Sequence, residues 1–244
     1  MSKILEVKNA TKRFGGLVAN EKVTFDVDEG EIVGVVGPNG AGKTTLFNSI
    51  SGAHPLTEGN IIFDGKDITT MKPHDICKLG IGRTFQIPQS LVELKVFENV
   101  LIGALCKRND MDEAMAHVDE ILELCGIADI KYELAGQLNV PQKKRLEIAR
   151  AMATDPKLLL LDETMAGLNA TERKASVDLI RKINSTGVAI LTIEHNMDVV
   201  MNVSKRVVVL VSGKLLTIGT PEEVISNPEV ISAYLGGGAK EDGE

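Results

Sequence analysis

Residues 37–44 constrain the fold of this chain more than any other stretch, because they match every fixed position of the pattern G-x-x-x-x-G-K-[ST]. The stretch reads Gly37-Pro38-Asn39-Gly40-Ala41-Gly42-Lys43-Thr44. An apolar run rich in β-branched residues, 31–36, comes directly before it and is typical of a buried strand. A helical pattern follows from Thr45 to residue 50. The sequence therefore predicts a strand, a glycine-rich loop and a helix in that order.

Each residue type in this loop suits the binding of phosphate. The glycines permit positive φ, so consecutive N–H groups can turn inward around an anion, and the N-terminus of the following helix adds further donors. Lys43 offers a compact charge to the terminal phosphates, and the hydroxyl of Thr44 is placed to ligate Mg²⁺. The alternative is a glycine-rich turn before an ordinary helix, but the flanking strand and helix favour a nucleoside triphosphate site.

Composition and charge exclude several classes of function. With 244 residues, 43% of them hydrophobic, the chain can bury a substantial core as one domain. A net charge of −7 gives no global attraction for DNA or RNA, and 3% aromatic residues without Trp argue against base-stacking surfaces, so no nucleic acid partner is expected. No run approaches the roughly 18 apolar residues of a spanning helix, and the N-terminus lacks a signal peptide. We expect a cytoplasmic chain whose contact with a membrane goes through another protein.

The remaining pattern predicts an α/β fold. Residues 4–27 alternate apolar and polar side chains and predict antiparallel strands, with a turn at Gly15-Gly16 and a further strand at 59–65. Apolar runs at 158–161 and 188–193 end in Asp162-Glu163 and Glu194-His195, with a helical segment at 171–184 between them. This order is typical of a parallel sheet whose ligand lies beyond the carboxyl ends of the strands.

Helices are expected in the middle and at the end of the chain. Apolar residues recur at helical spacing from 114 to 125, and a second helix is predicted over 142–152. Lys143, Lys144 and Arg145 lie near the start of that helix, where cations oppose the helix dipole, so we expect an anion nearby. A hairpin over 207–218 and a capping box at 220–223 precede the last helices. The three cysteines are predicted to be small buried hydrophobic residues; they are Cys77, Cys106 and Cys125.

The ordered set of motifs resembles the ATP-binding subunits of ABC transporters, and the resemblance covers nearly the whole chain. The set comprises residues 37–44, Gln86, 138–142, Asp162-Glu163, 166–169 and Glu194-His195. The segments 80–86, 96–100, 145–151 and 227–236 are similar to the branched-chain amino acid importer branch of that family.

The resemblance implies a single ABC ATPase domain over 1–244, of α/β class: a P-loop NTPase core with a parallel sheet, an N-terminal antiparallel β subdomain and a helical subdomain. The implied bounds are 1–86 and 155–220 for the RecA-like core with the antiparallel β subdomain, 87–154 for the helical subdomain, 221–236 for C-terminal helices and 237–244 for a frayed tail.

The resemblance also implies a role for each site residue. Phe14 would stack on adenine, and the ATP phosphates would be held by Gly37, Pro38, Asn39, Gly40, Ala41, Gly42, Lys43, Thr44 and Thr45. Mg²⁺ would be bound by Thr44, Gln86 and Asp162. Glu163 would polarise the attacking water and His195 would contact the γ-phosphate, with Lys43 and Gln86 completing the catalytic set. Taken singly, each has an ordinary alternative: a core phenylalanine, a loop glutamine, a solvated strand end and a hydrogen-bonded histidine.

Two positions depart from the family pattern. The signature loop usually reads Leu-Ser-Gly-Gly-Gln, and here the residues are Leu138, Asn139, Val140, Pro141 and Gln142. In the family this loop contacts the nucleotide of a partner subunit, but Pro141 has no N–H and Val140 disfavours positive φ, while Asn139 could offer a side-chain amide. We hypothesise that the site completed by this signature is weaker than the site built on the chain's own phosphate loop. Thr164 stands where proline often follows the glutamate, and the sequence assigns it no role.

The leading interpretation is the ATP-hydrolysing motor of an importer for branched-chain or related amino acids. Two ATPase subunits, identical or different, would close around ATP and act on permease subunits through residues 87–92, at the inner face of the cell membrane. A urea, amide or lipid-export transporter is the alternative within the family. A soluble ATPase acting on ribosomes or DNA is an alternative of another class, although tandem cassettes are lacking; a weakly hydrolytic regulatory subunit is disfavoured by Glu163 and His195.

Overall fold

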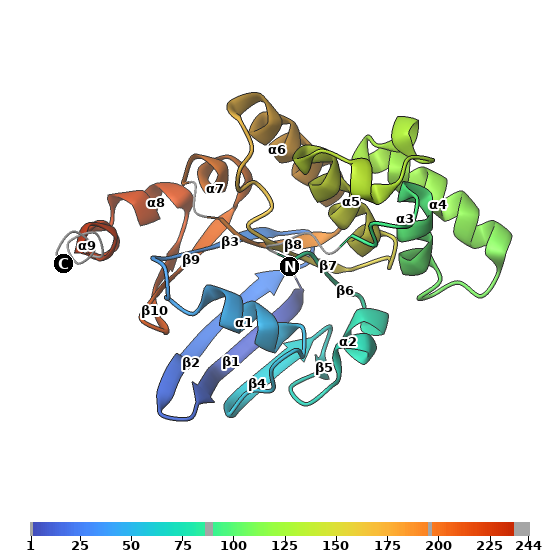
Figure 1. Cartoon of the computed structure of the whole chain (residues 1–244). Helices are drawn as coiled ribbons and strands as arrows, with labels where there is room; N and C mark the ends of the chain where they lie inside the picture. Colours follow the sequence, from blue (N-terminus) through green and yellow to red (C-terminus); the bar gives the residue numbers. More distant parts are fainter. Residues whose placement is uncertain (1, 86–89, 195–196, 237–244) are drawn as a thin grey trace.

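The chain folds around two β-sheets and a layer of helices, as Figure 1 shows for the computed structural model, which describes residues 2–85, 90–194 and 197–236. The smaller sheet is antiparallel and has the order β2-β1-β4-β5. Its strands are β1 Lys3–Phe14, β2 Leu17–Asp28, β4 Glu58–Phe63 and β5 Lys66–Asp67.

The larger sheet has six strands in the order β10-β9-β3-β8-β7-β6. Its strands are β3 Ile32–Val36, β6 Ile81–Arg83, β7 Leu158–Asp162, β8 Ala189–Ile193, β9 Arg206–Val211 and β10 Lys214–Gly219. Every neighbouring pair is parallel except β9 and β10, which form the C-terminal hairpin. Since β3 lies beside β8, and β8 beside β7, the residues that follow these three strands meet at one edge of the sheet.

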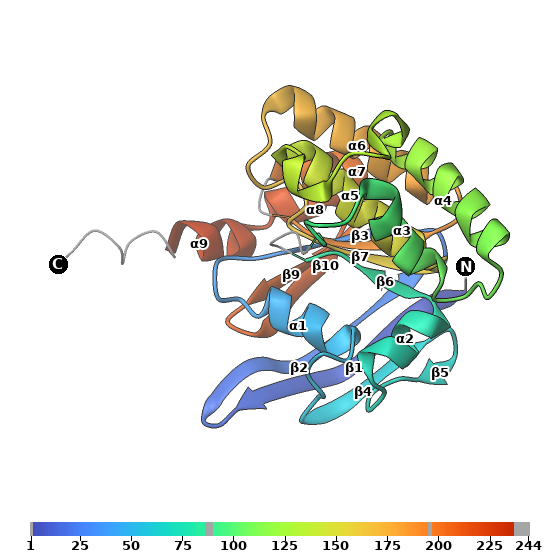
Figure 2. The same ribbon diagram turned by 45° about the vertical axis from the view of Figure 1, so that its right-hand side comes forward.

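Helices cover both faces of the larger sheet. The helices are α1 Lys43–Ile50, α2 Pro73–Leu79, α3 Val96–Ala104, α4 Met111–Cys125, α5 Val140–Met152, α6 Ala170–Asn184, α7 Met197–Val203, α8 Pro221–Ser226 and α9 Pro228–Gly236, with 3-10 turns at Ala128–Ile130 and Ala135–Gln137. Figure 2 shows α3, α4, α5 and α6 on one side of this sheet, and α1 with the smaller sheet on the other.

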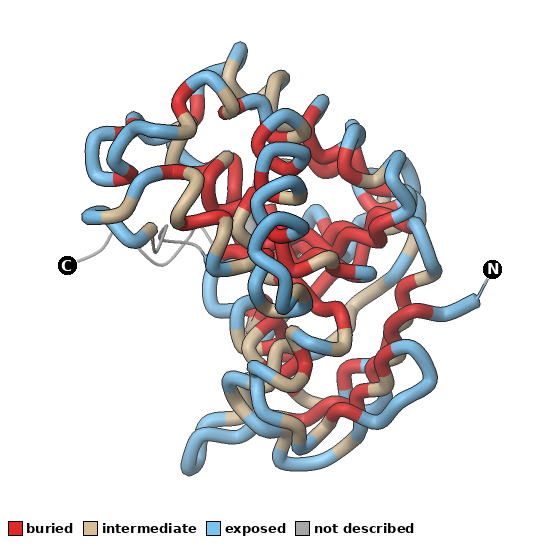
Figure 3. Tube along the Cα trace, turned by 90° about the vertical axis from the view of Figure 1, so that its right-hand side faces the viewer, coloured by how far each residue is buried: buried red, intermediate tan, exposed pale blue. Residues whose placement is uncertain are grey.

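The strands of the larger sheet send alternate side chains into two separate hydrophobic cores. Ile32, Leu159 and Ile190 belong to the core between the sheet and the helices α3, α4, α5 and α6. Val33 and Leu160, each one residue further along its strand, belong to the core shared with α1 and the smaller sheet. Figure 3 shows that the buried parts of the chain gather at the centre of the molecule and the exposed parts lie around them. The sheet is therefore the common wall of both cores.

The predicted fold class is confirmed in its main parts: a parallel sheet, an antiparallel sheet at the N-terminus and a helical layer. The strands β1 and β2 are longer than the alternating runs in the sequence, because register shifts such as that between Val7 and Ala10 interrupt the alternation. The subdomain boundaries stay predictions, and residues 237–244 lie outside the described part of the chain.

The prediction for the cysteines is correct for one of the three. Cys125 is fully buried in α4. Cys77 and Cys106 are only half-buried, and their Sγ atoms lie 4.0 Å apart, although 29 positions separate them in the sequence. Packing of α2 against the turn after α3 brings the two thiols together, which sequence spacing does not reveal.

Candidate active site

The loop between β3 and α1 has the backbone conformation that its glycines allow. Gly37, Gly40 and Gly42 have φ of 152°, 76° and 92°. A Cβ on Gly37 would overlap the carbonyl oxygen of Leu210, and a Cβ on Gly42 would overlap that of Ala19, whereas Gly40 faces open space. Two of the three positions therefore exclude a side chain by space as well as by backbone conformation.

Lys43 is the buried cation of the loop. Its Nζ donates to the carbonyl oxygens of Gly37 at 2.6 Å and Pro38 at 3.1 Å. Burial lowers the pKa of Lys43, and the charges of Glu163 and Asp162 oppose that shift. The next residue, Thr44, is exposed in the first turn of α1. The loop thus combines a desolvated charge with an accessible hydroxyl.

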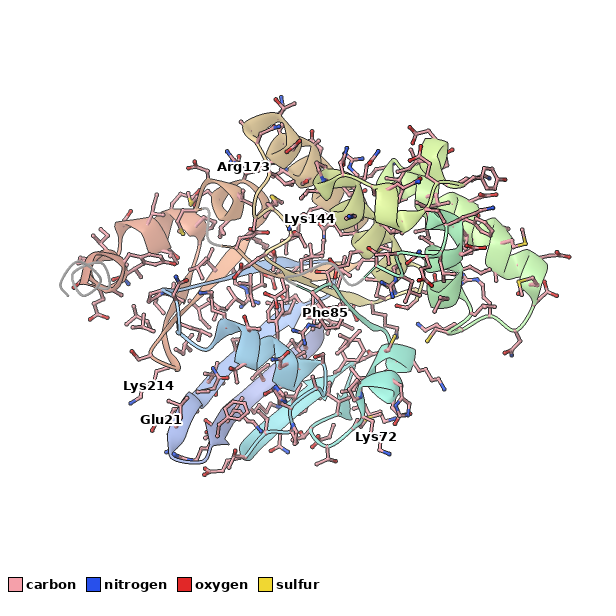
Figure 4. All side chains as sticks on the ribbon, in the orientation of Figure 1. Glu21, Lys72, Phe85, Lys144, Arg173 and Lys214 are labelled. Atoms are coloured by element: carbon pink, nitrogen blue, oxygen red, sulfur yellow. The ribbon has the colours of Figure 1, made fainter. Side chains whose placement is uncertain are left out.

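A cavity of about 740 Å³ opens over this loop, a size within the range of small-molecule sites. Its walls are residues 39–45 of the loop, Glu163, residues 17–19 of β2, and Ser212 with Gly213 of the β9–β10 turn. The N–H of Glu21 donates to the carbonyl of Gly213 at 2.8 Å, and Lys214 forms an ion pair with Glu21 beside it, as labelled in Figure 4. The two hairpins that border the cavity are therefore tied together.

Phe14 does not line this cavity. The residue is 44% exposed, and its ring packs edge to face against His54 with ring centroids 5.6 Å apart, while Nζ of Lys12 lies 4.8 Å from its centroid. Leu17 and Val18, from the same hairpin, line the cavity instead. Stacking of Phe14 on adenine stays a prediction. Leu17 and Val18 form a second apolar surface, which lies in the wall of the cavity itself.

Asp162 ends β7 and is buried, with its Oδ2 at 3.4 Å from Nη2 of Arg83. Burial raises the pKa of Asp162, and the charge of Arg83 opposes the rise. The other oxygen, Oδ1, is buried and has no hydrogen-bond partner among the described residues. The charge of Asp162 acts on Lys43 of the phosphate loop, and an orphaned carboxylate oxygen there fits a hard cation such as Mg²⁺; the exposed Thr44 hydroxyl of the same loop is an oxygen ligand of the same kind.

Glu163 lines the cavity next to Lys43, 8% exposed and with a φ of 51°. Its N–H donates to the carbonyl of Ile193 in β8 at 3.0 Å, and its carbonyl accepts from Nζ of Lys144 in α5 at 3.1 Å. The structure thus brings three predicted groups to one site: the loop residues, Asp162 and Glu163. Gln86 and His195 lie outside the described residues, so their roles stay predictions.

Glu194 follows β8 and is buried, and the charge of Glu163 acts on it. Its Oε1 accepts from the Thr164 hydroxyl and from the N–H of Met165, both at 3.3 Å. Burial is the main cause that raises the pKa of Glu194 to about 7; these hydrogen bonds and the charge of Lys144 act in the opposite direction. The departure at Thr164 therefore has a local structural role, which the sequence did not indicate.

The signature residues form the start of α5. Asn139 is the N-cap: its Oδ1 accepts from the N–H of Gln142, and its own N–H donates to Oε1 of Gln142, both at 3.0 Å. Val140 is exposed and Pro141 lies in the first turn, where a missing N–H costs no helical hydrogen bond. Leu138 is buried. The cap uses both carboxamide oxygens and neither of the amide nitrogens, the Nδ2 of Asn139 and the Nε2 of Gln142.

Two of the three cations near the start of this helix have partners within the chain, and the expected anion stays a prediction. Lys144 points inward to the carbonyl of Glu163, and the charges of Glu194 and Glu147 act on it. Arg145 donates from Nη1 to the carbonyl of Cys125 at 3.0 Å and so caps the end of α4. Internal carbonyls and buried acids therefore account for these two charges.

Comparison with known proteins decides the family. A family model described as ABC transporter matches residues 20–166, more than half of the chain. The chain belongs to the ABC transporter family. A second model, described as branched-chain amino acid ATP-binding cassette transporter, matches residues 214–240 of this ABC ATPase. The predicted family and ATPase activity are thereby confirmed.

Relatives and solved structures agree over the full ABC cassette. The high-affinity branched-chain amino acid transport ATP-binding protein BraF of Pseudomonas aeruginosa is 41% identical, over 96% of this chain and 98% of its own. LivG of Escherichia coli K12 is 38% identical with the same coverage. The crystal structure of the ADP conformation of an ATP-binding cassette of an ABC transporter is 33% identical, with a TM-score of 0.87, over 97% of this chain and 100% of that one. A dimeric cassette in a post-hydrolysis state, bound to ADP and Pi, is 25% identical, with a TM-score of 0.80, over 89% of this chain and 98% of that one.

Some residues of the site were missed by reasoning from sequence. Lys144 and Glu194 were noticed as charges but not as neighbours of Glu163. Tyr234 of α9 was assigned no role: burial raises its pKa, and the backbone of Gly37 in the phosphate loop opposes the rise. The cations at the start of α5 were the one sequence signal that pointed toward Lys144.

Proposed function

We propose that this ABC ATPase is the motor subunit of an importer for branched-chain or related amino acids. The observation that carries the substrate class is the match of residues 214–240 to the branched-chain amino acid cassette model, together with full-length relatives of that name. The comparisons do not favour urea, amide or lipid transport, nor a role outside transport.

The proposed mechanism assigns each step of ATP hydrolysis to residues around the cavity. The loop N–H groups and Lys43 bind the phosphates and hold the γ-phosphoryl group in line for attack. Glu163, which lines the same cavity, orients and polarises the attacking water. Bound Mg²⁺, held by Thr44, Asp162 and the expected Gln86, would neutralise charge on the phosphate oxygens. The arrangement needs positioning and electrostatics rather than a covalent intermediate.

A second ATPase subunit is proposed as the direct partner, because related cassettes form dimers. In that arrangement Asn139 and Gln142 would present their amide nitrogens to the partner's nucleotide, in place of the serine and glycine donors usual in the family. We infer that the site which they complete hydrolyses ATP more slowly than the site on this chain's own loop. Replacing residues 139–141 by Ser-Gly-Gly should raise turnover of the assembled complex, and unchanged turnover contradicts the inference.

Permease subunits are proposed to dock beside the Gln86 segment. Of the residues expected to dock there, Leu91 and Val92 are 41% and 56% exposed, and the nearby Leu134 is 40% exposed. The helices in the described ranges are too short or too polar to cross a bilayer. Attachment to the inner membrane face through permeases follows from the proposal.

Uptake of radiolabelled leucine by cells that carry the transporter tests this function. Glu163→Gln in the chromosomal copy should abolish ATP-dependent leucine uptake while leaving the level of the protein unchanged. A matched strain with Glu172→Gln, a half-buried residue in the first turn of α6 whose new amide oxygen can still accept the cap bond from Asn169, should take up leucine normally. Normal uptake by the Glu163→Gln strain, with loss of uptake of a chemically different solute, contradicts the proposed substrate class.

A further inference from the structure

Lys144 is a buried cation that directly contacts the backbone of Glu163. It lies in the second turn of α5, 8% exposed, and its Nζ donates to the carbonyl of Glu163 at 3.1 Å. Figure 4 shows Lys144 on the side of α5 that faces the sheet. A buried ammonium group is costly unless it is paired and hydrogen-bonded. The ammonium group of Lys144 therefore needs this hydrogen bond, whose two partners lie 19 positions apart in the sequence.

The backbone of Glu163 needs external support. Its φ of 51° is uncommon for a residue with a side chain, and such conformations persist where the surroundings hold them. Three hydrogen bonds hold this one. The N–H of Glu163 donates to the carbonyl of Ile193 in β8, and its carbonyl accepts from the N–H of Ala166 at 3.2 Å within the same turn and from Nζ of Lys144 in α5. Of these three bonds, the one from Lys144 is the only one that links the Glu163 backbone to α5.

The residues after Glu163 are anchored to the same cluster. Glu194, 3% exposed, accepts hydrogen bonds from the Thr164 hydroxyl and the Met165 N–H. The charge of Glu194 acts on Lys144 together with that of Glu147, whose Oε1 accepts from the N–H of Phe85 at 2.6 Å. This chain has Thr164 where the family often has proline. Proline has no hydroxyl and could not make the hydrogen bond that Thr164 donates to Glu194.

We propose that Lys144 is a positioning residue for hydrolysis: by binding the carbonyl of Glu163 it holds the Glu163 carboxylate in its working orientation, and it couples α5 to that carboxylate. The inference rests on the proposed function of Glu163. Lys144 follows Gln142 by two residues on a helix that begins at the signature. Movement of the start of α5, when the signature engages a partner's nucleotide, is thereby transmitted to this chain's own hydrolytic site.

Steady-state ATP hydrolysis by the full-length chain tests the proposal. Lys144→Met retains the length and packing of the side chain but removes its donor, so kcat should fall at least about tenfold. KM and the affinity for a fluorescent ATP analogue should stay within about twofold, because the loop that binds the phosphates is untouched. Lys144→Arg should restore at least about a third of kcat. Lys143→Met removes a charge from the neighbouring, half-exposed position and should leave kcat within about twofold.

Two comparisons separate the possible failures. Glu163→Gln should abolish hydrolysis; if it does not, the proposed function of Glu163 fails, and the proposal for Lys144 with it. If Glu163→Gln is inactive but Lys144→Met keeps a normal kcat, only the proposal for Lys144 is overturned. Equal losses of kcat and nucleotide affinity without rescue by arginine also overturn it, since they indicate a structural role. If Lys144→Met does not fold, the double variant Lys144→Met with Glu194→Gln is measured instead. The second change removes the buried acid that the first leaves without its cation, and kcat and KM are compared in the same way.

Discussion

Arg206 binds Glu31 through two parallel hydrogen bonds of 2.7 Å, from Nε to Oε1 and from Nη2 to Oε2. The same guanidinium group reaches a carboxylate oxygen of Asp26 at 3.2 Å. The side chain of Glu31 is 1% exposed. Because Arg206 begins β9, Glu31 precedes β3 and Asp26 lies in β2, one side chain joins the two sheets at the end remote from the phosphate loop.

Arg206→Met should lower the free energy of unfolding by about 3 kcal/mol, because it leaves the Glu31 carboxylate buried without its main partner. Lys214→Met is the matched control. It breaks the Lys214–Glu21 ion pair, whose side chains are 65% and 40% exposed, and should cost less than about 1 kcal/mol. Urea unfolding of both variants measures the difference. Equal losses would show that burial of Glu31 is not the deciding factor.

Glu194 should make stability depend on pH near neutrality. Burial raises its pKa from the ordinary 4.5 to about 7, so the folded chain retains a proton that the unfolded chain releases. This contribution is complete below pH 4.5 and is lost as pH rises through about 7. Glu194→Gln keeps an acceptor oxygen and cannot ionise, so it should be more stable than the native chain at about pH 8 and equal to it at about pH 5. Melting temperatures at the two pH values test this; a difference independent of pH contradicts it.

Gly187, which follows α6, is a matched control for Gly42 of the phosphate loop. Their φ values are 92° and 95°, so alanine carries a similar backbone penalty at both positions. The Cβ of Gly42→Ala would overlap the carbonyl of Ala19, whereas Gly187 faces open space. Gly42→Ala should therefore weaken ATP binding at least about tenfold, and Gly187→Ala should leave it unchanged at a cost of about 1 kcal/mol in stability. Titration with a fluorescent ATP analogue distinguishes the two effects.

Cys77 and Cys106 should form an intramolecular disulfide with diamide, which accepts the two electrons and two protons released by the thiols. Their Sγ atoms need to approach from 4.0 Å to about 2 Å. Burial raises the pKa of Cys125 to about 12, so that thiol should stay reduced in the folded chain. Mass spectrometry after alkylation should show one linked pair, absent in Cys106→Ser and retained in Cys125→Ala. Disulfide-linked dimers in place of the internal pair contradict the prediction.

Local patterns predicted the phosphate loop and the strands that end at Asp162-Glu163 and Glu194. Each of these signals lies within one strand or one turn: an apolar run, a glycine spacing or a charged strand end. Once these strands are assigned to one parallel sheet, their ends must lie close together, because the carboxyl ends of parallel strands lie at the same edge of the sheet. For this reason the prediction placed Asp162 and Glu163 beside the loop.

Relationships between layers could not be predicted from the sequence. The direction of Lys144 depends on how α5 packs over the sheet, and the contact of Phe14 with His54 depends on the loop after α1. The approach of Cys77 to Cys106 likewise depends on how α2 meets the end of α3. These contacts join residues remote in sequence, and side-chain periodicity carries no information about which helix face meets which loop.

The division of hydrophobic residues between the two sides of the larger sheet has an evolutionary consequence. Substitutions on the outer surfaces of α3 and α4 should not disturb the packing of β1 or α1, because Leu159 and Leu160 face opposite cores and the sheet separates them. Inserting one residue into β7 would exchange those two faces and disrupt both cores at once. The outer surface of the helical layer can therefore vary without disturbing the core shared with α1 and the smaller sheet, while the strands that carry Asp162 and Glu163 tolerate almost no change in length.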